Sequence, residues 1–300
     1  MTPKHIILTL LLMLCPIGMA AQSTITRNKP KPAVTKPKPA AKPKAKPKAK
    51  PAPRRNSTHH SSSTNSTTGL SAELNKLIND MVYVSGGTFT MGGTSEQGND
   101  AYTNEKPTHS VTLSSYYICK YEVTQVLWRA VMGSNPSNFK GDNLPVECVS
   151  WNDCQTFINR LNSYTGRNFR LPTEAEWEFA ARGGNYSRHY KYSGSNDIDD
   201  VAWYIDNSNK RPHPVGTKQA NELGLYDMSG NVGEWCSDWD GSYSSYSQTN
   251  PTGPNSGSFR VHRGGFWRYN ARYCRTPERS SKTPDYCVNY IGLRLVLSKL

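Results

Sequence analysis

The sequence predicts an α+β domain over residues 71–300 that is irregular and loop-rich, with short antiparallel strands and about three helices. Three observations favour this class. Short β-prone runs are separated by glycines and turn residues, and three amphipathic segments carry helix-capping residues. A long stretch after Gly184 has little periodicity and is rich in Tyr, Asn, Ser, Asp and Gly, which is typical of functional or ion-stabilised loops.

The strand predictions follow from alternating and β-branched runs. Met81–Val84 and residues 88–91 flank Gly86 and Gly87, a pattern that predicts a hairpin around a glycine turn. Similar runs predict strands at residues 109–113, 116–118, 260–263 and 291–297.

Three helices are predicted from their caps. The first follows Thr124 and ends at Gly133, the second follows Ser150 and ends at Gly166, and the third follows Thr173. The supporting residues are the capping partners Asp153 and Glu176 and the apolar stripe Cys154, Phe157, Ile158 and Leu161. We expect the glutamates of the third helix to be structural and Cys154 to be a buried thiol.

The charge of the chain is confined to its first 70 residues. The 300 residues hold 36 basic and 23 acidic side chains, a formal net charge of +13. Residues 1–70 contain 13 of the basic residues, 10 of the 20 prolines and neither Asp nor Glu, so residues 71–300 carry 23 charges of each sign. A nucleic-acid-binding domain with a basic face is therefore not expected.

Residues 1–21 have the order of a secretory signal. Lys4 precedes the apolar run 6–14, and small residues ending at Ala20 and Ala21 follow it. The nine-residue run is too short to span a bilayer, and the alternative to cleavage is an uncleaved signal anchor. Lipid attachment at Cys15 is disfavoured, because a small residue is preferred immediately before the cysteine and Leu14 stands there. The protein is predicted to be exported, to the periplasm, the cell envelope or the extracellular space.

Residues 22–70 are predicted to be a disordered linker. Lys-Pro and Lys-Ala pairs recur between Arg27 and Arg55, which indicates an extended polyproline II spacer, and residues 57–68 form a flexible Ser/Thr/Asn-rich stretch. The lysines can contact an anionic cell-wall or membrane surface, or the segment can be a solvated linker without a partner.

Several motifs occur in an order that resembles the formylglycine-generating-enzyme, or sulfatase-modifying-factor, family, whose fold is related to C-type lectins. They are MVYVSGGTFTMG at 81–92, YEVT at 121–124, LPTEAEWEFAARGG at 171–184, GLYDMSGNVGEW at 224–235, RGG at 263–265 and IGLR at 291–294. The resemblance covers residues 81–297 and implies the fold of this family.

The resemblance implies a copper-binding cysteine pair that oxidises a substrate cysteine with O2, but this chain departs from the pattern. Phe266 stands at the serine position and Tyr269 at the position of the first cysteine, while Cys274 aligns outside the pair and Gly233 replaces a tryptophan. Because loss of one cooperating residue removes most of a rate enhancement, formylglycine-generating activity and copper are not expected.

The family's structural calcium is expected to be retained. The resemblance implies that Asp227 and Glu234 contribute carboxylates and that Gly230 and Val232 contribute carbonyl oxygens, which are the ligands that calcium prefers. The alternative is that the two carboxylates cap turn amides. An iron site of a related branch is not expected, because the histidines, among them His213 and His262, are scattered and suit surface or hydrogen-bonding roles.

Two functions remain open. The first is a non-catalytic, calcium-stabilised binding or scaffold protein of the cell envelope that recognises a protein or glycan; the second is a metal-dependent oxidoreductase of the family with altered ligands, using Cys274 and Cys287. The predicted ligand-binding residues are the large and fork-shaped side chains Phe266, Trp267, Arg268, Tyr269 and Arg272. With Cys15 removed, six cysteines permit fifteen disulfide pairings.

Overall fold

The computed structural model describes residues 63–298, and the predicted signal peptide and Lys/Pro spacer lie outside this range. The predicted disordered linker ends at residue 70, but α1 (Ser63–Asn79) already begins at Ser63, so the prediction is wrong for residues 63–70. Leu77 is buried in the core, and Leu70, Leu74 and Ile78 pack against it. These four positions share one helix face, so burial of that face stabilises a segment whose polar composition favours disorder.

A long two-stranded ribbon replaces the predicted hairpin. β1 (Met81–Val84) pairs with β4 (Tyr116–Cys119), and β2 (Gly87–Met91) pairs with β3 (His109–Leu113), both antiparallel and in one continuous register. These four strands were predicted and are confirmed, whereas the predicted pairing of the first two strands is wrong. At the bend, a Cβ on Gly86 would lie 2.5 Å from the carbonyl oxygen of Leu113, so the glycine permits close backbone approach rather than a turn.

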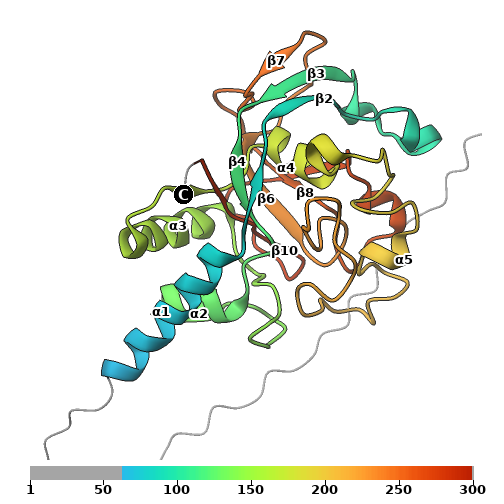
Figure 1. Ribbon diagram of the computed structural model, residues 1–300. Helices are drawn as coiled ribbons and strands as arrows, with labels where there is room; N and C mark the ends of the chain where they lie inside the picture. Colours follow the sequence, from blue (N-terminus) through green and yellow to red (C-terminus); the bar gives the residue numbers. More distant parts are fainter. Residues whose placement is uncertain (1–62, 299–300) are drawn as a thin grey trace, which may run out of the picture. The chain divides into compact units, whose positions relative to one another are not determined.

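The described strands form three sheets, with the orders β1-β4-β11-β5, β10-β6-β8-β9 and β2-β3-β7 (Figure 1). The other strands are β5 (Phe169–Arg170), β6 (Gly233–Trp239), β7 (Gln248–Thr249), β8 (Arg260–Arg263), β9 (Arg279–Lys282), β10 (Ile291–Gly292) and β11 (Val296–Leu297). The single strand predicted for residues 291–297 is therefore two short strands in different sheets. β6 was not predicted, because its residues were interpreted only as an ion-binding turn.

The three predicted helices are confirmed with their caps. Thr124 caps α2 (Gln125–Met132), and capping boxes start α3 (Trp151–Thr165) and α4 (Glu174–Ala181). Two helices were not predicted, α1 and the four-residue α5 (Ile198–Val201). Short 3-10 helices are η1 (Ser95–Asp100), η2 (Thr103–Glu105), η3 (Gly184–Tyr186) and η4 (Ala271–Cys274). None of the described helices is long and apolar enough to span a membrane.

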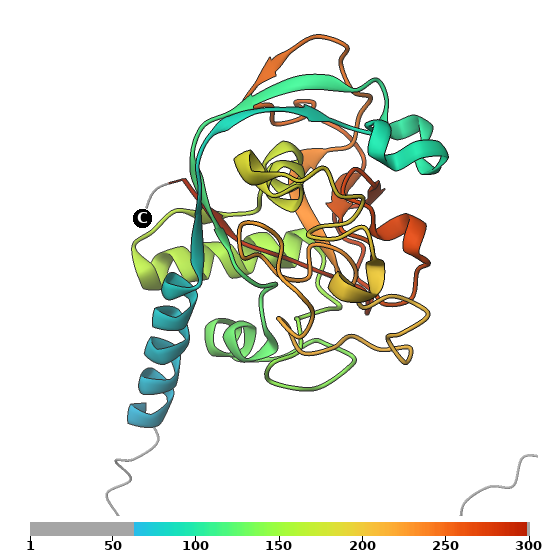
Figure 2. The same ribbon diagram turned by 45° about the vertical axis from the view of Figure 1, so that its right-hand side comes forward.

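Helix α4 lies at the centre of the domain. All of its residues are buried, and it is seen between the β2–β3 ribbon and the β6–β8 sheet (Figure 2). Its three glutamates bind arginines: Glu174 pairs with Arg279, Glu176 with Arg170, and Glu178 with both Arg182 and Arg263. The expectation that these glutamates are structural agrees with this pairing.

Candidate functional site

The turn before β6 carries the residues expected to bind calcium. Asp227 has φ 59° and Gly230 has φ 81°, both in the left-handed region. A Cβ on Gly230 would lie 2.4 Å from the carbonyl oxygen of Trp203, so only glycine fits there. The Asp227 carboxylate is buried; its Oδ2 accepts a hydrogen bond from the Gly216 amide at 2.7 Å, while Oδ1 has no hydrogen-bond partner among the described residues.

The second predicted carboxylate, Glu234, is already neutralised. Its oxygens accept hydrogen bonds from the Arg294 guanidinium at 2.6–3.0 Å and from Trp177 Nε1 at 2.7 Å, and both members of the ion pair are fully buried. Arg294 also donates to the carbonyl oxygens of Cys119 and Tyr226. Glu234 thus joins α4, β6 and the C-terminal segment.

Glu122 completes the acidic cluster and was not predicted from the sequence. It accepts hydrogen bonds from the Val232 amide at 3.0 Å and from Asn231 Nδ2 at 2.7 Å, and it lies in the YEVT motif more than 100 residues away. Burial raises its pKa, and the carboxylates of Asp227 and Glu234 raise it further. Burial also raises the pKa of Asp227 to about 6.

Arg294 binds Glu234 directly, whereas neither Glu122 nor Asp227 forms an ion pair with a described residue. The buried, unpartnered Asp227 Oδ1 fits a bound cation. In residues 63–298, no group of three or more His, Cys, Asp or Glu side chains forms a metal-binding cluster. A cation here would therefore be held by Asp227 and main-chain carbonyls of the turn.

The predicted ligand-binding residues separate into buried and exposed members. Phe266 and Trp267 are buried, and Trp267 Nε1 donates to the carbonyl oxygen of Asn289 at 3.0 Å. Arg268 and Tyr269 are exposed. Arg272 is half-buried, with its guanidinium stacked 3.9 Å from the centre of the Tyr102 ring. Phe266 and Trp267 are therefore packed beneath the surface, next to the exposed Arg268 and Tyr269.

An aromatic cluster surrounds Phe266, and we define it as Phe266, Tyr269, Tyr273, Tyr286 and Tyr290. The centre of the Phe266 ring lies 4.0 Å from that of Tyr269 and 4.1 Å from that of Tyr290. Tyr269 also packs on Tyr273 at 4.6 Å, and the hydroxyls of Tyr286 and Tyr290 are 3.1 Å apart. Tyr286 and Tyr290 come from the segment before β10, so the cluster joins two regions of the chain.

A pocket of about 210 Å³ opens beside this aromatic cluster. It is lined by Asn104, His262, Phe266, Tyr269, Arg279, Ser280, Ser281, Lys282 and Tyr290. His262 was expected to be a surface or hydrogen-bonding residue, and this expectation is wrong: it is buried, and its Nε2 has no hydrogen-bond partner among the described residues. The sequence contained no signal for this pocket beyond the position of His262 on a predicted strand.

The thiols do not reproduce a reactive pair. Cys274 is buried beside Gly265, and burial raises its pKa to about 12, so it stays a neutral thiol. Cys287 is exposed, and its neighbour Val288 accepts a hydrogen bond from the Cys148 amide. Cys154 is buried, as predicted.

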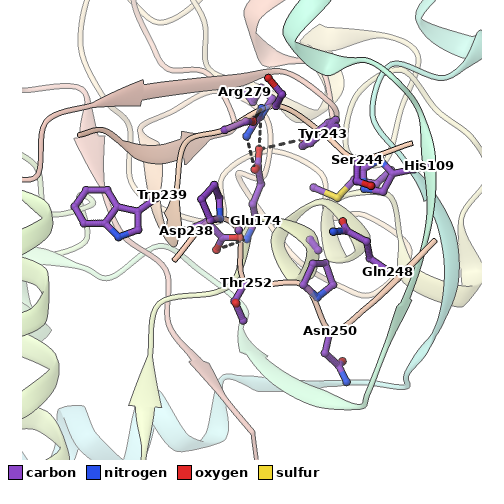
Figure 3. A pocket seen from close by; sticks show the side chains of 17 residues that line it. His109, Glu174, Asp238, Trp239, Tyr243, Ser244, Gln248, Asn250, Thr252 and Arg279 are labelled. Atoms are coloured by element: carbon purple, nitrogen blue, oxygen red, sulfur yellow. Dashed lines mark hydrogen bonds and ion pairs between the residues drawn. The ribbon is translucent and has the colours of Figure 1, made fainter. Parts of the chain in front are cut away.

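A larger pocket, of about 350 Å³, lies between α4 and the loop that follows β6 (Figure 3). Tyr243 and Arg279 both bind the Glu174 carboxylate, and His109 packs on Tyr243 with ring centres 5.0 Å apart. Asp238 Oδ2 accepts hydrogen bonds from the Glu174 amide and the Ser237 hydroxyl. Burial, and then the Glu174 carboxylate, raise the pKa of Asp238 to about 7.

Comparison with known proteins assigns the fold to a family. A model of the sulfatase-modifying factor enzyme 1-like domain matches residues 67–299. The chaperone protein LppX of Paenibacillus barcinonensis is 38% identical over 239 residues, covering 63% of this chain and 79% of that protein. The formylglycine-generating enzyme of Streptomyces coelicolor is also 38% identical, over 185 residues, covering 56% of this chain and 57% of that enzyme.

Solved structures give the same result. Treponema denticola variable protein 1 aligns with a TM-score of 0.68 at 33% identity, covering 73% of this chain and 95% of that one. PvdO from Pseudomonas aeruginosa aligns with a TM-score of 0.61 at 25% identity, covering 73% and 94%. These matches confirm the predicted fold class, and the chain belongs to the sulfatase-modifying factor family, whose formylglycine-generating-enzyme-like domain spans residues 67–299.

Proposed function

We propose that this protein is an exported, non-catalytic binding or scaffold protein of the cell envelope. The observation that carries the proposal is Tyr269, which stands where the family's first catalytic cysteine is expected and is 38% exposed at the edge of the aromatic cluster. A phenol cannot replace a thiolate as a ligand of Cu(I). Exposed aromatic and arginine side chains on a rigid support are typical of recognition surfaces.

The alternative oxidoreductase has weaker support. It requires Cys274 and Cys287 to act as thiolates on a common ion, yet Cys274 is buried with a raised pKa whereas Cys287 is exposed. The names of two relatives, a chaperone protein and a variable protein, also favour a role other than sulfatase activation.

The binding surface is tested with a double variant, Arg268→Ala/Tyr269→Ala, of the full chain. Both side chains are exposed, so the fold should be retained, and we expect loss of capture of an envelope protein or glycan from envelope extracts. Tyr246→Ala is the matched control, because Tyr246 is 81% exposed on the loop after β6. Equal capture by the double variant and the wild type would refute the binding surface, as would conversion of a sulfatase-derived peptide to its aldehyde.

Calcium is proposed to stabilise the turn before β6. A ligand that binds only the native state raises its stability by mass action. We therefore expect 1 mM calcium to raise the Tm of the chelator-treated wild type and to leave Asp227→Asn unchanged, with Asp240→Asn as a control of equal charge change. A Tm of the wild type that is identical with and without calcium would refute this part of the proposal.

Export and the role of the Lys/Pro spacer belong to the same proposal. Cell fractionation followed by sequencing of the mature N-terminus tests cleavage after Ala20 or Ala21. Recovery of the intact chain in the cytoplasm would contradict it. Binding of the spacer to anionic envelope polymers should weaken steeply with salt, because exposed charges are screened over about 8 Å at physiological ionic strength.

A further inference from the structure

The His262 imidazole is an unusual group to find at the wall of a pocket. Its side chain is 3% exposed, its Nε2 has no hydrogen-bond partner in residues 63–298, and its ring packs edge-on against Trp235 with centres 5.7 Å apart. A buried polar atom without a partner costs about 1–3 kcal/mol, so such atoms are rare unless a ligand or water completes them. Burial lowers the pKa of His262 to about 3, so the ring is neutral.

The walls of the pocket combine aromatic rings with small polar groups. Phe266 lies between Tyr269 and Tyr290, whose ring centres are 6.5 Å apart. On the other side, the lining includes the amide of Asn104 and the hydroxyls of Ser280 and Ser281. A volume of about 210 Å³ is below the range of about 300–1,000 Å³ that is usual for drug-sized ligands, so the pocket suits one ring rather than an extended chain.

The Asp240 carboxylate accepts a hydrogen bond from the lining residue Ser281 at 2.8 Å, so charged groups of both signs border the pocket. Lys282 lines it, and the Arg268 guanidinium lies 5.4 Å from the centre of the Tyr290 ring. Neither cation forms an ion pair with another described residue, whereas Arg279 is neutralised by Glu174. The nearby Glu278 is buried and bonded to the Ser280 hydroxyl, and burial raises its pKa to about 7. Among the described residues that line the pocket, Lys282 is the cation without an ion-pair partner, and it favours a negatively charged group on the ligand.

We propose that this pocket binds a single uronic-acid-type sugar ring of an acidic envelope polysaccharide. The proposal rests on the binding function proposed above and names its ligand class. A sugar hydroxyl can donate or accept, so it suits the His262 imidazole at the pocket wall in either tautomer. Tyr269 and Tyr290 contact the face of the ring, and Lys282, which lines the pocket, binds its carboxylate.

The probes that test this are D-glucuronate, D-glucose and N-acetyl-glutamate amide, titrated into the full chain. The readout is the ¹⁵N chemical shift of the His262 imidazole together with the Kd from fluorescence. We expect D-glucuronate to shift the His262 signal and to bind at least tenfold more tightly than D-glucose. Equal affinities for the two sugars, no shift of His262, or equal binding of the glutamate derivative would overturn the proposal.

Two variants separate the roles of the residues. Lys282→Met should weaken D-glucuronate at least tenfold and leave D-glucose unchanged, while Lys120→Met is the matched control, a lysine that also lies over tyrosine rings. His262→Phe should weaken both sugars, with near-ultraviolet circular dichroism used to verify the fold. If envelope capture requires Tyr269 but not Lys282 or His262, the proposed function stands and this assignment of the ligand is wrong.

Discussion

Asp238 in the pocket of Figure 3 provides a test of how burial controls the stability of this domain. Its pKa rises from 3.8 to about 7, because burial disfavours the carboxylate and the neighbouring Glu174 adds repulsion. Between pH 4 and pH 7 the unfolded chain has released this proton and the native protein still holds it. The contribution of Asp238 to stability is therefore complete below pH 4 and is lost as the pH rises through 7.

The magnitude follows from the two pKa values. A rise from 3.8 to about 7 corresponds to about 4 kcal/mol between the protonation states. Asp238→Asn removes the titration and keeps an oxygen that can accept the hydrogen bonds now made by Oδ2, which are 3.0 Å from the Glu174 amide and 2.9 Å from the Ser237 hydroxyl. The variant should therefore gain stability relative to wild type as the pH rises.

Urea unfolding monitored by tryptophan fluorescence at pH 4.5, 6 and 8 measures this difference. We expect Asp238→Asn to be close to wild type or slightly less stable at pH 4.5 and more stable by about 2–4 kcal/mol at pH 8. Asp240→Asn is the control, since it removes a carboxylate that is exposed and near the same pocket. A stability difference that is independent of pH would refute the reasoning.

Three further predictions concern packing and thiols. Arg294→Met should lower the unfolding free energy by about 3–5 kcal/mol, because it leaves the buried Glu234 unpaired. Adding Glu234→Leu to the same chain should restore part of the lost free energy in urea unfolding. If the losses of the two single variants simply add in the double variant, the two side chains are not paired. Gly230→Ala should lower the Tm more than Gly224→Ala. Both glycines have φ near 80°, but only at Gly230 would the added Cβ lie 2.4 Å from a carbonyl oxygen. Equal Tm values for the two variants would show that the clash is relieved. In the reduced native protein, a maleimide should label the exposed Cys287 first, as detected by mass spectrometry. The four buried thiols should be labelled only in urea; they are Cys119, Cys154, Cys236 and Cys274. Early labelling of any of these four would contradict their burial.

The position of most elements could be predicted, because capping and periodicity act over a few residues. Thr124, Ser150 and Thr173 each begin a helix as predicted. The helix α1 could also have been found, since Leu70, Leu74, Leu77 and Ile78 share one face, but the surrounding Ser, Thr and Asn residues concealed it. Composition describes the free segment, whereas the core against which it packs is a property of the whole chain.

The candidate sites were predicted less completely, because their groups come from distant parts of the chain. The motif that contains Glu122 was recognised, but its contact with the turn at Val232 joins residues 110 positions apart. His262 was placed on a strand without any indication that its Nε2 would lack a partner beside a pocket. Pairing of charges and exclusion of solvent are decided by packing, and a local pattern carries no information on either.

By itself, the sequence determined the family of the fold and the ends of the central helices. These properties depend on residue identity and on spacing within a few turns of chain. The tertiary structure alone decided that β1 and β2 continue as one ribbon, that Glu234 is neutralised by Arg294, and that the aromatic cluster borders a pocket lined by His262. The physical reason is that strand pairing and burial are set by contacts between segments far apart in sequence, whose free energies appear only when the whole domain folds.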